Sequence, residues 1–418
     1  MIQSSSRRKF LQLAGGAVAA GAFARTAVSY ARVIGANDRI LLGQIGCGGR
    51  GYNAHMGGVH PHDKAENVEY AAVCDVWTVH RDRAAQRVQE WYGQPAKQYS
   101  SYKELLDQKD LDAVMIATCD HQHTTHLKAA VEAGKDVYCE KPLAMDMASL
   151  NAAVDAVKAT DRVVQIGTQL RSLPSFTGCR EMYRTGVMGK VSRVEQMRNA
   201  AHPYWYERTT QKVEAKDVDW PEFLCGKMPR PFSAGLFTGW FGYRGFSEGP
   251  VPQLGVHFLD SMHYIMGVGI PQSCVCHGGI FSFKDDNHFD CPDSVQATWV
   301  YPEGFVVSYS TNFGNGGGSG SRMYGEHATL DWTDWAAPFL TTTGTAAKGK
   351  LASKDPVKPV LRPDHFQDWL QCLRTRKTPN APIDAGYQHS VAAIMAVRAF
   401  DTGKRQIYDA EKREVREG

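Results

Sequence analysis

The chain has 418 residues, of which 43% are hydrophobic and 22% are charged, and its formal net charge is +3. This length is enough for two domains, each with its own hydrophobic core. Because the lysines and arginines form no basic run, the composition argues against a nucleic-acid partner.

The N-terminal segment has the features of an export signal. Ser6-Arg7-Arg8-Lys9-Phe10-Leu11 resembles the twin-arginine motif, and a weakly apolar stretch over residues 11–24 follows it. Ala22-Phe23-Ala24 offers a cleavage site, and the stretch is too short and too rich in Gly and Ala for a stable membrane span. We therefore expect a signal and linker over residues 1–35, and a periplasmic or otherwise exported protein that the twin-arginine machinery carries in folded form.

The first predicted strand, residues 39–45, runs directly into Gly46-Cys47-Gly48-Gly49-Arg50-Gly51. This is GxGxxG between a strand and a helix, the context in which the motif binds a dinucleotide. The glycines permit a tight turn and let backbone N–H groups approach the pyrophosphate.

A second strand, residues 68–74, ends at Asp75. A carboxylate there can hydrogen-bond the adenosine ribose and repel a 2′-phosphate, so NAD is favoured over NADP. Arg81 and Arg83 leave NADP open. The alternative for Asp75 is that it only caps the following helix.

Helices and strands alternate through the rest of the first half. Predicted helices cover residues 102–108, 124–134 and 148–160, and predicted strands cover 112–118, 136–139 and 163–167. This order predicts an α/β Rossmann domain with a doubly wound parallel sheet over residues 36–167. Ligands bind at the carboxyl ends of such strands, where Asp120-His121-Gln122-His123 and Glu140-Lys141-Pro142 lie.

Residues 168–418 predict a second domain. Its β-rich runs cover 191–198, 274–283, 294–300 and 305–312, with hairpins expected at Tyr301-Pro302-Glu303-Gly304 and at the glycine-rich segment 314–320. Amphipathic helices within 365–402 are expected to pack near the first domain. The four cysteines at predicted strand ends, Cys47, Cys74, Cys119 and Cys139, are expected to be small apolar core residues rather than disulfide partners.

The ordered set of motifs resembles the Gfo/Idh/MocA family, which includes glucose-fructose oxidoreductase and inositol dehydrogenase. Gly167-Thr168-Gln169 with Arg171, and Gly255-Val256-His257-Phe258-Leu259-Asp260, extend the resemblance into the second half. The resemblance implies an α+β second domain with an open, mostly antiparallel sheet that lines the substrate cleft. It also implies a homo-oligomer through the outer face of that sheet.

The resemblance assigns proton transfer to Lys141, oriented by Glu140. A lysine desolvated beside the positive nicotinamide has a lowered pKa and suits this role. His257 is a second group for the same hydroxyl, and Asp260 at i+3 is expected to hold its imidazole. The alternatives are a surface lysine and a structural histidine.

Gln253 is a departure from the family, whose dehydrogenases often carry Asp four residues before this histidine. Glutamine cannot take a proton. Either Lys141 and His257 share the work, or the protein does something other than simple dehydrogenation.

Two sets of contact residues follow. Those expected to contact the cofactor are Gly46, Gly48, Gly49, Arg50, Gly51, Asp75, Thr118, His123, Glu140 and Lys141. Those expected to contact a sugar are Arg171, Tyr204, Tyr243, Gln253 and His257, although a core role is an alternative for each aromatic residue. The histidines that follow the predicted strand 112–118, which are His121, His123 and His126, have no convincing three-ligand spacing, so no metal is predicted.

The sequence thus predicts an exported NAD(P)-dependent oxidoreductase that moves a hydride to or from a secondary hydroxyl of a sugar or cyclic polyol. Free NAD is scarce outside the cytoplasm, so the cofactor is expected to be held tightly and recycled by a second sugar. The first alternative is an NAD-dependent glycosidase that works by transient oxidation and elimination. The second is a non-catalytic sugar-binding protein, which Gln253 favours and which Lys141 and His257 disfavour.

Overall fold

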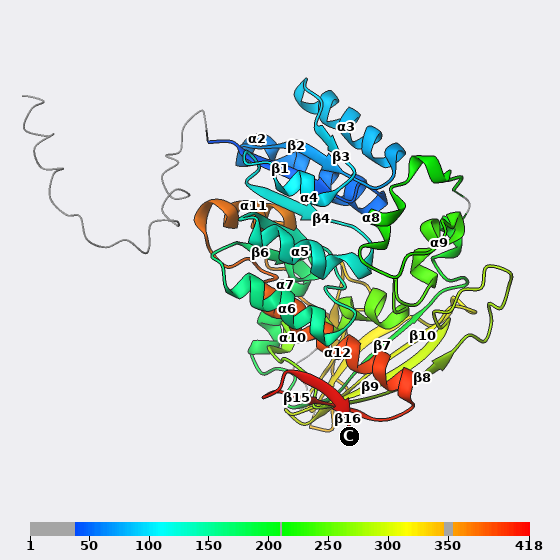
Figure 1. Cartoon of the computed structure of the whole chain (residues 1–418). Helices are drawn as coiled ribbons and strands as arrows, with labels where there is room; N and C mark the ends of the chain where they lie inside the picture. The colour runs from blue at the N-terminus through cyan, green and yellow to red at the C-terminus, as the bar shows by residue number, and fades with distance from the viewer. Residues whose placement is uncertain (1–37, 210, 347–353) are drawn as a thin grey trace, which may run out of the picture. The chain divides into compact units, whose positions relative to one another are not determined.

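A six-stranded parallel sheet forms the centre of the first domain within the described part of the chain (Figure 1). The structure, a computed structural model, describes residues 38–209, 211–346 and 354–418, and the predicted export signal lies outside them. The strand order is β3-β2-β1-β4-β5-β6, which confirms the predicted doubly wound sheet. The strands are β1 (Ile40–Ile45), β2 (Val68–Cys74), β3 (Lys97–Tyr99), β4 (Ala113–Ile116), β5 (Asp136–Cys139) and β6 (Val164–Ile166).

The chain reverses its direction of sheet growth between β1 and β4, and the crevice beyond these strand ends is where such folds bind ligands. Strand β4 is shorter than predicted, since residues 112 and 117–118 of the predicted strand lie outside it. The helical segments of this domain are η1 (Arg50–Met56), α1 (Gly57–Val59), η2 (His60–His62), α2 (Asp63–Glu66), α3 (Thr78–Tyr92), α4 (Tyr102–Leu106), η3 (Asp120–Gln122), α5 (His123–Glu132) and α6 (Met147–Lys158).

The second sheet has ten strands in the described ranges, in the order β14-β13-β12-β11-β7-β10-β9-β8-β15-β16. Among the described strands of this sheet, the β7–β10 pair alone is parallel, so the predicted mostly antiparallel sheet is confirmed. The strands are β7 (Val191–Asn199), β8 (Ser273–Gly279), β9 (Ser294–Tyr301), β10 (Phe305–Asn312), β11 (Gly320–Gly325), β12 (Thr329–Asp331), β13 (Phe339–Thr341), β14 (Asp355–Pro356), β15 (Gln406–Asp409) and β16 (Glu414–Glu417).

The two predicted hairpins have different outcomes. Strands β9 and β10 pair antiparallel across a tight turn whose Gly304 has φ +87°, which confirms the first hairpin. The second prediction, a hairpin at residues 314–320, is wrong. Strands β10 and β11 both pair with β7, which lies between them, so the glycine-rich segment crosses over a neighbouring strand.

Helices of the second half connect the two sheets. They are η4 (Gln169–Ser172), α7 (Pro174–Arg184), η5 (Tyr206–Arg208), η6 (Ala215–Asp217), α8 (Trp220–Leu224), α9 (Ala234–Thr238), η7 (Trp240–Gly242), η8 (Val251–Gly255), α10 (Val256–Met266), α11 (His365–Thr375) and α12 (Ile383–Thr402). The indole of Trp299 in β9 donates to the Ala392 carbonyl of α12 across 2.9 Å, and the Trp369 ring of α11 packs 5.7 Å from that of Tyr138 in β5. The ring contact places α11 against the first sheet, and the hydrogen bond places α12 against the second sheet.

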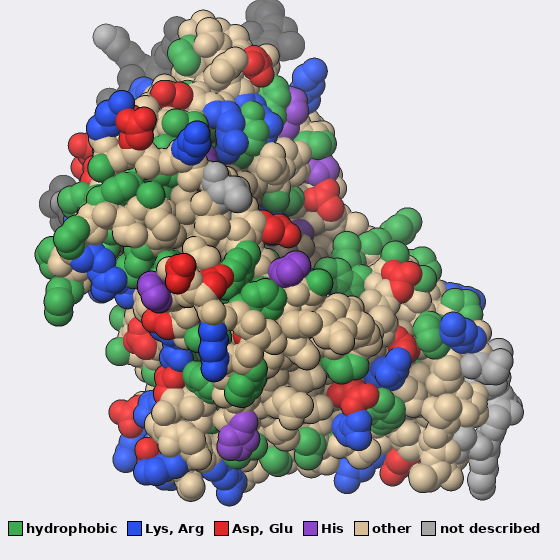
Figure 2. Space-filling view, turned by 90° about the vertical axis from the view of Figure 1, so that its right-hand side faces the viewer, with side chains coloured by type: hydrophobic (Ala, Val, Ile, Leu, Met, Phe, Trp, Pro, Cys, Tyr) green, Lys and Arg blue, Asp and Glu red, His purple; other side chains and the backbone are tan. Residues whose placement is uncertain are grey.

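Three further features concern the surface charge, the helices and the cysteines. Figure 2 shows Lys and Arg interspersed with Asp and Glu over the face it draws. No helix among the described residues is long and apolar enough to cross a membrane. The ten cysteines all lie in the described ranges, where no disulfide joins them, and Cys47, Cys74 and Cys139 are buried as expected.

Candidate active site

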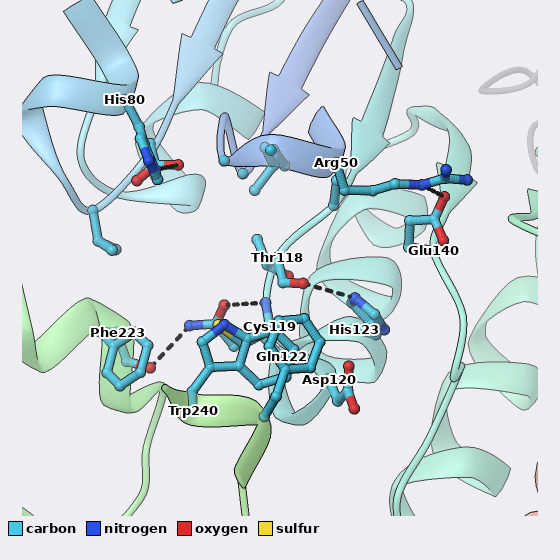
Figure 3. Close-up of a pocket in the computed structure, with 18 of the residues that line it drawn as sticks. Arg50, His80, Thr118, Cys119, Asp120, Gln122, His123, Glu140, Phe223 and Trp240 are labelled. Carbon is cyan, nitrogen blue, oxygen red and sulfur yellow. Dashed lines mark hydrogen bonds and ion pairs between the residues drawn. The ribbon is translucent and has the colours of Figure 1, made fainter. Parts of the chain in front are cut away.

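A cleft of about 720 Å³ opens beyond the carboxyl ends of the first sheet. The loops after β1, β2, β4 and β5 line one side, and residues from 204 to 257 of the second half line the other (Figure 3). This is the position expected for a ligand at the switch point of a doubly wound sheet.

The glycine loop lies at one end of the cleft. Backbone atoms crowd it at Gly46 and Gly51, while it is open at Gly49. Gly46 has φ +84°, and a Cβ there would lie 2.6 Å from the Ala117 carbonyl oxygen. A Cβ on Gly51 would lie 1.9 Å from the Gly46 carbonyl oxygen. At Gly49, by contrast, no described atom lies within 4 Å of an added Cβ, so the loop faces open space where a pyrophosphate can approach.

The Asp75 carboxylate lies against this loop. It accepts hydrogen bonds from the backbone N–H groups of Cys47 (2.7 Å) and Trp77 (2.8 Å). The guanidinium groups of Arg81 and Arg83 donate to the backbone carbonyls of Asp75 (3.0 Å) and Cys47 (3.1 Å). The glycine cradle and a strand-end carboxylate fit NAD, whose pyrophosphate and ribose hydroxyls they match.

Glu140 is a buried carboxylate held by several donors. Its Oε1 lies 2.6 Å from Arg50 Nε (Figure 3). The same oxygen lies 3.1 Å from each of His55 Nε2 and Gln169 Nε2. Burial alone would raise the pKa of Glu140, but Arg50 and His55 hold it well below the usual value. Glu140 therefore stays ionised, and its link to Lys141 is through the backbone N–H of that residue, at 3.3 Å.

Lys141 reaches from the end of β5 into the second domain. Its Nζ donates to the Gln253 backbone carbonyl across 2.7 Å. Burial of the amino group lowers the pKa of Lys141, while Glu140 and Asp120 act in the opposite direction. A lysine in this state can exchange a proton at neutral pH more readily than an exposed lysine.

Asp120 is a site residue that the sequence analysis missed. Its side chain is 4% exposed, lines the cleft, and accepts a hydrogen bond from Gln253 Nε2. Burial raises the pKa of Asp120 to about 8, against the opposing effects of Lys141 and the Gln253 hydrogen bond. Its position shortly after β4, among the residues beyond the carboxyl ends of the strands, was the available signal in the sequence.

His257 lies at the start of α10 and lines the cleft. Its buried Nδ1 has no hydrogen-bond partner within the described chain. Burial and then the charge of Lys141 hold the pKa of His257 well below its usual value, so the imidazole is neutral.

The prediction that Asp260 holds the His257 imidazole is wrong. The two Asp260 oxygens instead face Arg171 Nε at 2.8 Å and His389 Nδ1 at 3.2 Å. Although burial opposes it, the Arg171 charge keeps the pKa of Asp260 well below normal. Arg171 is therefore part of a buried ion pair and does not line the cleft, as a sugar contact would have to.

The structure places Tyr243 away from the cleft and His123 within its lining. The Tyr243 hydroxyl donates to the Asn287 carbonyl at 2.8 Å, and this side chain does not line the cleft. His123 lines the cleft, and its Nε2 lies 3.1 Å from the Thr118 carbonyl oxygen (Figure 3). Its Nδ1 lies 2.7 Å from the Pro142 carbonyl oxygen. His123 thus braces two strand-end loops.

Aromatic side chains form the wall of the cleft in the second domain. Trp240 and Phe241 stack with ring centroids 3.6 Å apart, and Tyr204 meets Phe241 edge-on at 5.5 Å. Glu207 and Thr238 add polar groups to this wall. Aromatic faces beside hydrogen-bonding groups suit a ligand with both apolar C–H surfaces and hydroxyls.

No group of three or more His, Cys, Asp or Glu side chains in the described ranges could hold a metal ion. His121 Nε2 lies 2.9 Å from the Phe223 carbonyl oxygen, and His126 Nδ1 lies 3.3 Å from Thr118 Oγ1. These histidines connect loops of the protein.

The sequence of the first domain matches that of a known protein family. Residues 40–168 match the sequence profile described as the GFO_IDH_MocA oxidoreductase family, NAD-binding Rossmann fold. An inositol 2-dehydrogenase/D-chiro-inositol 3-dehydrogenase from Lactiplantibacillus plantarum is 29% identical over 150 residues, which are 35% of this chain and 42% of that protein. A glycosyl hydrolase family 109 protein from Shewanella sp. (strain ANA-3) is 27% identical over 240 residues, 56% of this chain and 48% of that protein.

These alignments span less than half of the length of either relative. The fold likeness is wider. A levoglucosan dehydrogenase solved with NADH superposes with a TM-score of 0.67 at 16% identity, over 88% of this chain and 98% of that one. The two-domain fold is therefore shared along nearly the whole of that structure.

Proposed function

We propose that this protein is an exported NAD-dependent sugar or polyol oxidoreductase. The starting point is the match of residues 40–168 to the NAD-binding Rossmann domain of the Gfo/Idh/MocA oxidoreductase family. It transfers a hydride to or from a secondary hydroxyl of its substrate. The observation that carries the proposal is one cleft with a glycine loop at one end and Lys141, Asp120 and His257 together at the other.

Lys141 is the proton-transfer group in this proposal. Its amino group has a lowered pKa and is fixed by the Gln253 carbonyl, so it can take the hydroxyl proton of an alcohol, or return it in the reverse direction. The chemistry that NAD supplies when bound is the acceptance of a hydride with its two electrons. His257, neutral and with an unpartnered Nδ1 in the described chain, can bind or relay the same proton.

The substrate class rests on the aromatic wall and on the relatives. Trp240, Phe241 and Tyr204 can pack against the C–H face of a pyranose or cyclitol ring, while Glu207 and Thr238 face its hydroxyls. One relative is an inositol dehydrogenase, and one protein of the same fold is a levoglucosan dehydrogenase.

A redox-assisted glycosidase is the second candidate, favoured by the 240-residue similarity to a glycosyl hydrolase family 109 protein. In that reaction, oxidation of a sugar hydroxyl to a ketone would acidify the adjacent C–H bond, and loss of that proton would expel the aglycone. Water would then add in place of the aglycone, and return of the hydride to the ketone would restore both the hydroxyl and the oxidised cofactor. The same lysine would serve its redox steps. A non-catalytic sugar-binding protein is disfavoured, because such a protein has no need to desolvate the amino group of Lys141.

Export and assembly complete the proposal. The twin-arginine motif at Arg7 and Arg8 would carry the folded protein out with its cofactor tightly bound. Val275, Val300 and Val306 on the outer face of the second sheet are 39–41% exposed, and they suit a homo-oligomer contact there. Cell fractionation of an Arg7→Lys/Arg8→Lys variant tests export, and light scattering of a Val300→Asp/Val306→Asp variant tests assembly.

The activity is tested by the absorbance of reduced nicotinamide when the mature protein meets NAD and a panel of aldoses, glycosides and inositols. Wild-type protein should reduce NAD with some members of the panel. A Lys141→Ala variant should lose turnover by about 10²–10⁴-fold while it keeps its affinity for NAD and sugar. Unchanged turnover in this variant would remove Lys141 from the mechanism.

A further inference from the structure

A carboxyl group from the first domain, that of Asp120, meets the side chain of Gln253 from the second domain. Asp120 begins η3 on the loop that also carries Thr118 and Cys119 (Figure 3), and its side chain is buried at the wall of the cleft. Gln253 Nε2 donates to this carboxyl, and Ser247 is a further hydrogen-bond partner. These contacts fix the carboxyl within the active site.

Gln253 connects this carboxyl to the amine. Its backbone carbonyl accepts from Lys141 Nζ at 2.7 Å, and its side-chain amide donates to Asp120. Lys141 and Asp120 also act on each other electrostatically, each favouring the charged form of the other. Gln253 of η8 therefore binds both an amine, that of Lys141, and a carboxyl, that of Asp120, which come from two different loops of the first domain.

We propose that Asp120 is a positioning residue of this active site that shares one proton with Lys141, and so supplies the carboxyl that Gln253 lacks. This inference rests on the proposed oxidoreductase function. With the proton on Asp120, Lys141 is the free amine that can accept a hydroxyl proton. With the proton on Lys141, the Asp120 carboxylate stabilises the ammonium ion. Either arrangement leaves the buried pair without net charge, which lowers its desolvation cost.

The charged surroundings of the pair come from several elements. Glu248 faces Asp120, and the thiol of Cys291 lies within its electrostatic reach. Around Lys141 the charged and titratable groups are Glu140, Arg50, Arg198 and His257. Burial raises the pKa of Asp120 to about 8 and lowers that of Lys141, so burial brings the proton affinities of the two groups closer together.

The first test uses the mature protein without substrate, so it does not depend on turnover. Infrared titration should show the C=O stretch of a protonated carboxyl that disappears near pH 8, and an Asp120→Asn variant should lack this component. A Glu248→Gln variant, which removes the neighbouring carboxyl, should keep it. Absence of the component from wild-type protein, or its persistence in Asp120→Asn, would overturn the inference.

The second test removes the carboxyl from position 120 and then places one at position 253, the other side of the Asp120–Gln253 hydrogen bond. Asp120→Asn should lower kcat on a panel substrate by about 10²-fold, with KM little changed and an altered pH profile. The double variant Asp120→Asn/Gln253→Asp, which restores one carboxyl to the pair, should recover most of the loss. A wild-type rate and pH profile in Asp120→Asn, or no recovery in a folded, NAD-binding double variant, would contradict the shared proton.

The two tests separate two kinds of failure. If wild-type protein oxidises or reduces nothing in the panel but shows the infrared component, the oxidoreductase proposal fails and the shared proton stands. If it turns over sugar but lacks the component, only the role of Asp120 is lost.

Discussion

The guanidinium of Arg171 donates to the Asp260 carboxylate across 2.8 Å, and both side chains are buried. Asp260 lies on α10, the helix that also carries His257. Removing one partner of such a pair leaves an uncompensated buried charge, which costs about 3–5 kcal/mol. Arg171→Met should therefore lower the free energy of unfolding by about that amount in urea titrations. Arg184→Met, on an exposed helix face beside Glu181, should change it by less than about 1 kcal/mol. A stable Arg171→Met protein with weakened sugar binding alone would instead place Arg171 at the substrate.

Substitutions in the glycine loop should separate folding from cofactor binding. Gly49→Ala meets no described atom within 4 Å, so its thermal unfolding should match wild type, but its methyl group lies where the pyrophosphate must approach. We expect NAD affinity, measured by calorimetry, to fall by at least about tenfold. Gly57→Ala, equally free of close contacts and outside the cleft, should leave both quantities unchanged. Gly51→Ala, whose Cβ would lie 1.9 Å from a carbonyl oxygen, should fail to fold stably. Normal NAD affinity in Gly49→Ala would exclude this loop as the pyrophosphate site.

The charge of Asp75 should control the choice between NAD and NADP. Asp75→Asn removes a negative charge from the ribose end of the cleft, where repulsion of a 2′-phosphate is worth about 1–4 kcal/mol. The ratio of kcat/KM for NADP over NAD should rise by about tenfold or more. Asp82→Asn, the same change at an exposed position of α3 outside the cleft, should leave the ratio as it is. An unchanged ratio in Asp75→Asn would support the helix-capping alternative for this residue.

Acid should destabilise the protein through Glu140. Its folded pKa lies below the unfolded value of 4.5, so the unfolded chain binds the proton first, and the stabilisation is lost as pH falls below about 4.5. Glu140→Gln should be less stable than wild type by about 3–5 kcal/mol at pH 7, with the gap narrowing in urea titrations as pH falls below that value. Glu132→Gln, exposed beside Lys128, is the control and should show no such gap. A gap independent of pH would mean that Glu140 is not ionised in the folded protein.

Local patterns were sufficient to predict most of the fold. Strands β2 and β5 begin and end where the sequence places them, because buried parallel strands are short apolar runs bounded by turns. Strand β11 was missed, and with it the crossover from β10, since its partner β7 lies more than a hundred residues earlier in the chain. The short helices between β7 and α10 were also missed, since their aromatic residues follow no helical or strand period.

The site divides in the same way. The glycine loop, Glu140 and Lys141 lie in contiguous motifs, and the structure brings them to one cleft as predicted. The partner of each carboxyl group depends on how segments that are distant in the sequence pack against one another. Asp120 and Gln253 are 133 residues apart, and Arg171 and Asp260 are 89 apart. The sequence therefore could not show that Arg171 is committed to Asp260, or that Asp120 faces Gln253.

The most direct test of the oxidoreductase proposal is mass spectrometry of the sugars and glycosides recovered after incubation with the mature protein and NAD. The proposal predicts a product two hydrogens lighter than its substrate, with every glycosidic bond intact, formed by wild type and lost in Lys141→Ala. Release of an aglycone or free sugar without net oxidation would contradict it and assign the protein to the redox-assisted glycosidases.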